Sequence, residues 1–255
     1  MRLGWLQDPE TDVIGGAELS TALLRSRAPK GVDVVDVPPG SEMAGLDAYA
    51  VFNCTRYNFF PTVQMFGAAP VFKVVYDIWP HGDPKLREWF CHHAARLAFV
   101  SPLQREHFVH VVSVPEAMFP PGIDLEPFRA ARHPERQGTV WIGQMTGPHK
   151  GLEAAMEWAR ANGPVEFYGA GPRLAGPNVR HHGQVPPAEV PGILGRAERF
   201  LHLPAGIDAC PRTVLEAWAA ECEIVTNENQ GATWWVANAP EEIETGVARF
   251  WEMLR

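Results

Sequence analysis

Three charged residues in the second half of the chain stand where they could bind or polarise a ligand. Lys150 precedes Gly151 at the expected start of a helix, where a positive charge opposes the helix dipole unless an anion lies nearby. Asp208 and Glu216 lie eight positions apart in the stretch GIDACPRTVLEA. Each has an ordinary alternative, because surface lysines are common and the helix dipole alone favours an acid in an early helical turn. Taken together, the three residues favour a site for an anionic ligand.

The residues between the two acids predict how this site is built. Pro211 suits the first turn of a helix because it has no N–H group to lose. The free N–H groups of the next residues, Arg212, Thr213 and Val214, would then point toward an anion. The apolar residues of this helix share one face, so Glu216 is expected to point away from the core.

The order of the predicted elements indicates an α/β protein. Short apolar runs typical of buried strands alternate with helical patterns from end to end, which predicts parallel strands joined by crossover helices. This alternation stops over residues 120–138, a proline-rich segment that we interpret as a linker. We predict two Rossmann-like domains, residues 1–125 and 126–238, and a C-terminal helix over 239–255. Ligands of such sheets bind beyond the carboxyl ends of the strands, so the chemistry should lie in the loops that follow strands.

The composition excludes several classes of protein. A formal net charge of -8 without a stripe of basic residues disfavours a nucleic-acid backbone as partner. No apolar run approaches the roughly 20 residues that span a bilayer, and the start lacks the pattern of a signal peptide. We therefore expect a cytoplasmic protein without stable membrane insertion. The four cysteines and the pairs His92-His93 and His181-His182 lack ligand spacing, so no metal site and no disulfide framework are expected.

Two glycines follow the expected strand VEFY. Gly169 and Gly171 begin like a dinucleotide-binding fingerprint, but Leu174 occupies the place of its third glycine. We therefore reject a nicotinamide cofactor. The glycines still predict a tight turn close to a ligand.

Four segments of the second half, taken in order, resemble the nucleotide-binding domain of GT-B glycosyltransferases of the retaining family-4 group. These segments are WIGQMTGPHKG, FYGAGP, NVRHHGQV and GIDACPRTVLEAWA. Gly15 and Gly16, in the stretch GGAE, resemble the glycine loop of the first domain in that family. The segments VSPLQREHF and PPGIDLEPF resemble the end of that domain. The resemblance covers most of the chain and implies a small GT-B fold, in which two Rossmann-like domains face each other across a cleft.

The resemblance also implies roles for residues of this chain. Lys150 would bind the diphosphate of a nucleotide sugar, Asp208 would contact hydroxyls of its sugar, and Glu216 would hold its ribose. The other residues expected around this donor are Gly15, Gly16, Gln144, Gly169, Gly171, Arg212 and Thr213. No cofactor is implied, because the nucleotide diphosphate sugar is a co-substrate.

Two residues depart from the pattern of that family. Asp208 replaces the usual glutamate and is one methylene shorter. Gln144 stands where an arginine usually accompanies the lysine, which removes a positive charge from the leaving diphosphate. We hypothesise that Arg212 supplies the missing charge.

The N-terminal half is short for this fold and less similar to the family. Tyr76 and Asp77 end an expected strand, and His81 follows closely. These three residues are candidates for the acceptor side of the cleft. An aspartate after a strand is also often a helix cap, so a structural role for Asp77 stays open.

These features predict a metal-independent, retaining glycosyltransferase that moves a hexose from a nucleotide diphosphate sugar to an acceptor hydroxyl. Asp208 and Lys150 would be its catalytic residues. The alternatives are a sugar-nucleotide 2-epimerase, which would share the fold, and a catalytically inactive module that binds a nucleotide or a glycan. The residues leave open the base, the sugar, the oligomeric state and the acceptor, which is a glycan, a lipid-linked sugar, a small molecule or a modified base.

Overall fold

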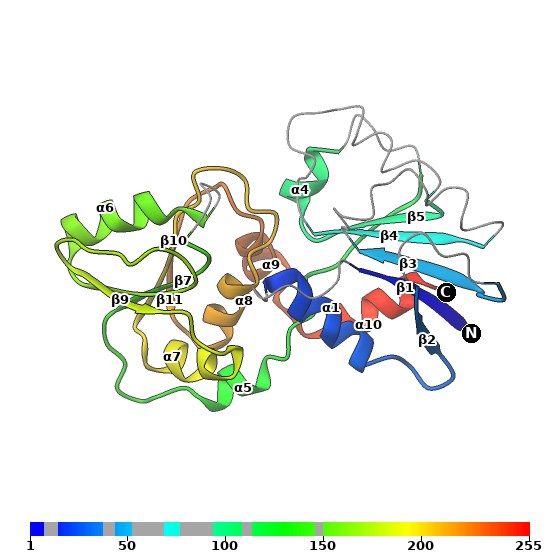
Figure 1. Ribbon diagram of the computed structural model, residues 1–255, viewed down its shortest axis with the longest axis horizontal. Coiled ribbons are helices and arrows are strands. Elements are labelled where there is room, and N and C mark those ends of the chain that lie inside the picture. The colour runs from blue at the N-terminus through cyan, green and yellow to red at the C-terminus, as the bar shows by residue number, and fades with distance from the viewer. Residues whose placement is uncertain (8–14, 38–43, 53–68, 77–93, 109–113, 146–149) are drawn as a thin grey trace. The chain divides into compact units, whose positions relative to one another are not determined.

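The computed structural model describes residues 1–7, 15–37, 44–52, 69–76, 94–108, 114–145 and 150–255. The chain divides into two units, which Figure 1 shows as ribbons. Unit 1 consists of Met1–Gly122 and Glu241–Arg255, and unit 2 consists of Ile123–Pro240. The sequence analysis divided the chain at residues 125 and 238 and set the C-terminal helix apart, whereas the structure groups that helix with unit 1.

Unit 1 is built on six parallel strands in the order β2-β1-β3-β4-β5-β6. These strands are β1 (Arg2–Leu6), β2 (Asp33–Asp36), β3 (Ala48–Phe52), β4 (Val71–Val75), β5 (Arg96–Phe99) and β6 (Glu116–Met118). Every residue of β3 and β4 is buried, as is typical of parallel strands that are covered on both faces. Its described helices are α1 (Gly16–Ser26), α4 (Pro102–Glu106) and most of α10 (Pro240–Met253).

An aromatic cluster in the core joins the C-terminal helix α10 to the sheet of unit 1. Trp5 of β1 lies against Phe52 of β3, with ring centroids 4.4 Å apart. Phe250 and Trp251 of α10 lie within 5.9 and 6.1 Å of the Trp5 ring. The indole N–H of Trp251 also donates to the carbonyl oxygen of Leu24 at 3.1 Å. The last helix is therefore a core element of unit 1.

Unit 2 is built on five parallel strands in the order β11-β10-β7-β8-β9. These strands are β7 (Thr139–Ile142), β8 (Val165–Tyr168), β9 (Val179–Gly183), β10 (Arg199–His202) and β11 (Glu223–Thr226). Its helical segments are α5 (Glu126–Ala130), α6 (Leu152–Asn162), η2 (Pro187–Glu189), α7 (Val190–Arg196), α8 (Arg212–Ala219) and α9 (Ala232–Asn238). The alternation of strands and helices that the sequence predicts in this half is confirmed.

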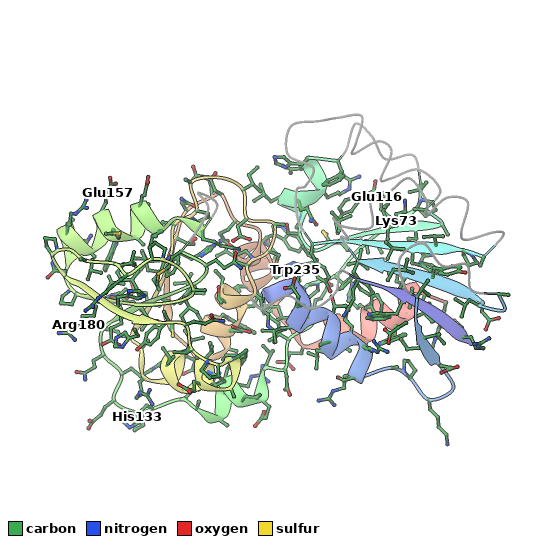
Figure 2. The ribbon with its side chains drawn as sticks, viewed as in Figure 1. Lys73, Glu116, His133, Glu157, Arg180 and Trp235 are labelled. Atoms are coloured by element: carbon green, nitrogen blue, oxygen red, sulfur yellow. The ribbon has the colours of Figure 1, made fainter. Side chains whose placement is uncertain are left out.

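The sheet of unit 2 is covered on both faces, with α6 on the side opposite α7 and α8 (Figure 1). Ala155 and Ala159 of α6 pack on Trp141 and Phe167 of the sheet. Glu157 of the same helix is exposed and points away from the sheet (Figure 2). The helix is thus amphipathic, with small apolar residues toward the sheet and a charged residue toward solvent.

Two details differ from the sequence-based prediction, and a third cannot be compared with the structure. The linker predicted over 120–138 contains helix α5, on which Phe128 is buried. The sequence KLREWFCHHAARL, residues 85–97, has a helical pattern to its end, but Arg96 and Leu97 belong to strand β5. The apolar run VHVVSV, residues 109–114, has the pattern of a strand and lies almost wholly outside the described residues.

Helices α5 and α7 approach closely because Gly195 has no side chain. A Cβ atom at Gly195 would lie 2.0 Å from the carbonyl oxygen of Ala131. The N–H group of His133 donates to the carbonyl oxygen of Gly195 at 3.0 Å. The segment that ends α5 is therefore held against α7 by backbone contacts.

Gly195→Ala should lower the free energy of unfolding by about 1–3 kcal/mol, because the two backbones must separate to admit the methyl group. Gly192→Ala on the same helix is the matched control, since its Cβ would meet only the Arg196 side chain, at 3.7 Å. That change should stabilise the protein by about 0.5–1 kcal/mol through helix propensity. Urea unfolding measures both effects, and two variants of equal stability would contradict the close approach.

Candidate functional site

The loops after β7 and β10 meet at one edge of the sheet of unit 2, because the two strands are parallel neighbours. Gly151, in the first of these loops, has a φ angle of 69°. A Cβ atom there would lie 1.9 Å from the carbonyl oxygen of Leu203, the residue that follows β10. Glycine tolerates both the backbone angle and the close approach. This contact places Lys150 beside the loop that carries Asp208.

Lys150 and Asp208 form a partly buried ion pair. The Lys150 Nζ atom donates to Asp208 Oδ2 at 2.7 Å. The side chains are 28% and 10% exposed, respectively. The backbone of Lys150 is held in turn, because the indole N–H of Trp141 donates to its carbonyl oxygen at 3.3 Å. The structure thus brings together the two residues that the sequence analysis named as catalytic.

A second nitrogen lies near the same carboxylate. His202, the last residue of β10, is almost fully buried, and its Nε2 atom lies 3.2 Å from Asp208 Oδ2. Burial alone would raise the pKa of the Asp208 carboxyl. The Lys150 ammonium and the His202 imidazole outweigh this effect and hold the pKa well below its usual range. Asp208 is therefore a carboxylate at neutral pH.

The loop of Asp208 is fixed by the segment that follows β11. The Asp208 N–H group donates to the carbonyl oxygen of Asn229 at 2.8 Å, and the Asp208 carbonyl oxygen accepts from the Gly231 N–H group at 3.1 Å. The side-chain amides of Asn227 and Asn229 both donate to the carbonyl oxygen of Pro204. The carboxylate is thus presented from a loop whose backbone is bonded at both ends.

Glu216 pairs with Arg212 one turn earlier on α8. Arg212 Nε donates to Glu216 Oε1 at 2.6 Å, and the two side chains are 12% and 7% exposed. The Glu216 side chain is buried, whereas the sequence analysis expected it on the face of the helix that points away from the core. The ion pair with Arg212 makes this burial possible, since a buried carboxylate needs a charged or hydrogen-bonding partner.

The first turn of α8 differs in detail from the predicted anion site. Pro211 caps the helix, which begins at Arg212. The N–H group of Val214 donates to the Pro211 carbonyl oxygen at 3.1 Å, so it is not free as predicted. Thr213 lies in the same turn and is half-buried.

The loops after β7 and β8 also approach closely. A Cβ atom at Gly169 would lie 1.7 Å from the carbonyl oxygen of Gly143, and one at Gly171 would lie 2.5 Å from the Cβ of Met145. Gln144 lies between these two contacts and is half-buried. The structure therefore brings Gln144 together with the two glycines of the predicted tight turn.

The candidates in the first half belong to unit 1. Gly15 caps α1, and its N–H group donates to the side chain of Glu18 at 2.9 Å. Gly16 is the first residue of that helix, and Tyr76 follows β4. Asp77 and His81 lie outside the described residues.

The sequence analysis missed His202. Its only signal was its position, at the end of the strand RFLHL and before the loop that carries Asp208. A single histidine between leucines is more often a core residue than a functional one. The ring becomes noticeable only through its distance to the carboxylate.

Solved structures resemble the chain over nearly its whole length. HepE from Anabaena, in complex with UDP and glucose, has a TM-score of 0.70 and 10% identity, over 100% of this chain and 94% of HepE. Sucrose-phosphate synthase from Thermosynechococcus elongatus has a TM-score of 0.71 and 12% identity, over 99% of this chain and 89% of the synthase. AviGT4, a glycosyltransferase involved in avilamycin A biosynthesis, has a TM-score of 0.59 and 18% identity, over 97% and 88% of the two chains.

The chain has the GT-B fold. The fold class that the resemblance implied is thereby confirmed, with parallel sheets of six and five strands. No protein-family model and no curated protein sequence matches the chain. At identities of 10–18% these likenesses establish the fold, and the activity has to be argued from the site.

Other sequence-based expectations concern thiols, metals and membranes. Cys210 and Cys222 are buried, and burial raises the pKa of both thiols, that of Cys222 to about 11. Cys54 and Cys91 lie outside the described residues. Within the described ranges, no cluster of three or more histidine, cysteine or carboxylate side chains is placed to hold a metal ion. None of the helices in that part of the chain is long and apolar enough to cross a bilayer.

Asp208→Asn should make the free energy of unfolding less sensitive to acid. In the unfolded chain an aspartate has a pKa of about 4, and the folded protein holds the pKa of Asp208 below that value. The ion pairing of Asp208 therefore stabilises the fold fully above about pH 4. This contribution is lost as the pH falls below about 4, so the advantage of the wild type over the variant should shrink there. Urea unfolding between about pH 7 and 3 measures that difference.

Asp36→Asn is the control, because this carboxylate pairs with Arg25 on the exposed surface. An exposed pair contributes at most about 1 kcal/mol, so this variant should follow the wild type at every pH. A gap between wild type and Asp208→Asn that stays constant down to pH 3 would contradict the depressed pKa of Asp208.

Proposed function

We propose that the protein is a retaining, metal-independent glycosyltransferase that moves a hexose from a nucleotide diphosphate sugar to an acceptor hydroxyl. The observation that carries this proposal is the contact of Lys150 with Asp208 at the carboxyl edge of the sheet of unit 2. A cation for the diphosphate and a carboxylate for the sugar then stand side by side. The GT-B fold supports the proposal. The UDP-glucose complex of HepE is an example of a protein with this fold that binds a nucleotide diphosphate sugar.

Lys150 would act on the leaving group. When the bond between the sugar and the diphosphate breaks, negative charge grows on the departing phosphate oxygens. A preorganised ammonium group stabilises that charge, which is often the largest contribution to catalysis at such a site. Lys150 suits this role because its backbone is fixed by Trp141 while its side chain is still partly exposed.

Asp208 would bind and orient the sugar. Its pKa is held low, so the carboxylate accepts hydrogen bonds from sugar hydroxyls over the whole physiological pH range. Its loop is bonded to the segment after β11, which keeps the carboxylate in one position. Such fixed positioning is what an oriented transfer reaction requires.

Glu216 would hold the nucleoside end of the donor, and Arg212 would hold its phosphates. Glu216 would accept hydrogen bonds from the ribose hydroxyls, with its orientation set by Arg212 Nε. Arg212 would add positive charge near the diphosphate, in place of the arginine that Gln144 replaces. A donor complex in which Arg212 points away from the phosphates would reject this role.

Gly15, Gly16, Tyr76, Asp77 and His81 of unit 1 are proposed for the donor and acceptor sides on the resemblance alone. A 2-epimerase would convert the nucleotide sugar without an acceptor, and an inactive binding module would bind it without converting it. Product analysis therefore separates the three functions.

A nucleoside diphosphate should raise the melting temperature of the protein without Mg²⁺. A ligand that binds only the native state stabilises it by about 2.7 kcal/mol at 100 times its Kd. Thermal unfolding with UDP, GDP, ADP and dTDP, each with and without Mg²⁺, measures this shift. One responding base would identify the donor class, whereas the absence of any shift would contradict the proposed phosphate site.

Lys150→Ala should reduce turnover of the nucleotide sugar about tenfold or more, because the charge on the leaving diphosphate loses its nearest cation. Release of the nucleoside diphosphate, followed with the donor that the panel selects, measures this loss. Lys30→Ala, at an exposed position in unit 1, is the matched control and should keep the wild-type rate. Full activity of Lys150→Ala would remove this lysine from the mechanism.

A further inference from the structure

His202 has a buried ring nitrogen that forms no well-aligned hydrogen bond with any described residue. The side chain is 2% exposed, and its ring lies parallel to that of Phe200, with centroids 6.4 Å apart. Among the described residues, Nε2 has no partner in hydrogen-bonding geometry. Burying a polar atom without a partner costs free energy, so a second state in which this nitrogen is bonded would repay that cost.

A carboxylate oxygen close to this nitrogen already accepts a hydrogen bond from a lysine. His202 Nε2 lies 3.2 Å from Asp208 Oδ2, outside the direction of a well-formed hydrogen bond. The same oxygen accepts from Lys150 Nζ at 2.7 Å. A lone pair on Nε2 would repel the carboxylate, so in a neutral imidazole the proton belongs on Nε2. The imidazole ring therefore places an N–H donor next to a carboxylate oxygen that is bonded to Lys150.

Binding of a nucleotide sugar would change the charge that surrounds Asp208. In the proposed function, Lys150 moves toward the diphosphate and can no longer fully neutralise Asp208. A carboxylate that is only 10% exposed then needs another partner, because an unpaired buried charge is strongly unfavourable. His202 is the residue whose donor group stands within 3.2 Å of it.

We propose that His202 is a positioning residue, whose Nε2–H group bonds Asp208 Oδ2 and keeps the carboxylate oriented toward the sugar when Lys150 turns to the diphosphate. The inference rests on the proposed function for the event that moves Lys150. The backbone of His202 is suited to a fixed role, because the Thr226 hydroxyl on the neighbouring strand β11 donates to its carbonyl oxygen at 2.6 Å.

The first test needs no donor. Lys150→Met removes the ammonium group while it keeps a side chain of similar length, and so imitates the departure of Lys150 from Asp208. In NMR spectra of protein labelled with ¹⁵N histidine, the Nε2–H proton of His202 should move downfield as it bonds the carboxylate. The shift should vanish in Lys150→Met combined with Asp208→Asn. An unchanged His202 signal in Lys150→Met would overturn the proposal.

The second test separates positioning from simple stability. His202→Gln places an N–H donor near the original Nε2 position, whereas His202→Leu fills the site without a donor. The first substrate to test is UDP-glucose, or the nucleotide sugar whose base the panel selects. With that substrate, His202→Leu should lower kcat about tenfold or more. His202→Gln should stay within about threefold of the wild type, and both should bind UDP within about twofold of it, since Asp208 contacts the sugar and not the nucleotide.

Leu201→Val is the matched control, because Leu201 is buried on the same strand, on the face of the sheet opposite to His202. It should lower the melting temperature and leave kcat unchanged below that temperature. A wild-type kcat for His202→Leu, or equal losses in His202→Gln and His202→Leu, would overturn the positioning role. A wild type that turns over no nucleotide sugar would instead refute the proposed function, and the donor-free NMR test would still decide the role of His202.

Discussion

The close approach of two loops at Gly151 is the constraint on which the candidate site depends. The backbone of residue 151 has a positive φ angle, and its Cα lies so near Leu203 that a methyl group would overlap the carbonyl oxygen of that residue. This contact lets the loops after β7 and β10 meet, although Lys150 and Asp208 are 58 positions apart in the sequence. The ion pair is a consequence of the backbone packing. A larger residue at 151 would separate the charges before it altered any functional group.

The ion pair itself is better understood as a device for binding than as a source of stability. The desolvation of two charges offsets much of their attraction, so a buried pair contributes little to folding compared with an apolar pair of the same size. A ligand that offers Lys150 a new anion, however, meets a cation that is already oriented and partly dehydrated. The 28% exposure of Lys150 against 10% for Asp208 indicates which partner is free to respond.

The sequence could predict the elements and the approximate place of the site, because both follow from local patterns. Apolar runs and helical periodicity located the strands of unit 2, and the strand-end rule placed Lys150 and Asp208 at the same edge. The sequence could not reveal that α5 lies within the proline-rich segment, because this five-residue helix is held by contacts with α7 and not by a pattern of its own. Nor could it reveal His202, whose neighbours in the sequence are those of a core residue. Both depend on distances that only the folded chain sets.

The charges of the described site show why one further donor stands beside one of its two carboxylates. Lys150 and Arg212 balance Asp208 and Glu216, so these four groups are neutral as a set before a donor binds. A diphosphate adds negative charge and, in the proposed function, draws on both cations at once. Each carboxylate then keeps its place only if some contact survives. Arg212 can hold Glu216 through Nε while its other nitrogens bond further partners, because a guanidinium group has five N–H donors. Lys150 has a single nitrogen on a flexible stem and cannot serve both partners as well. The asymmetry between the two cations therefore explains why a further donor is needed beside Asp208 and not beside Glu216, and His202 occupies that position.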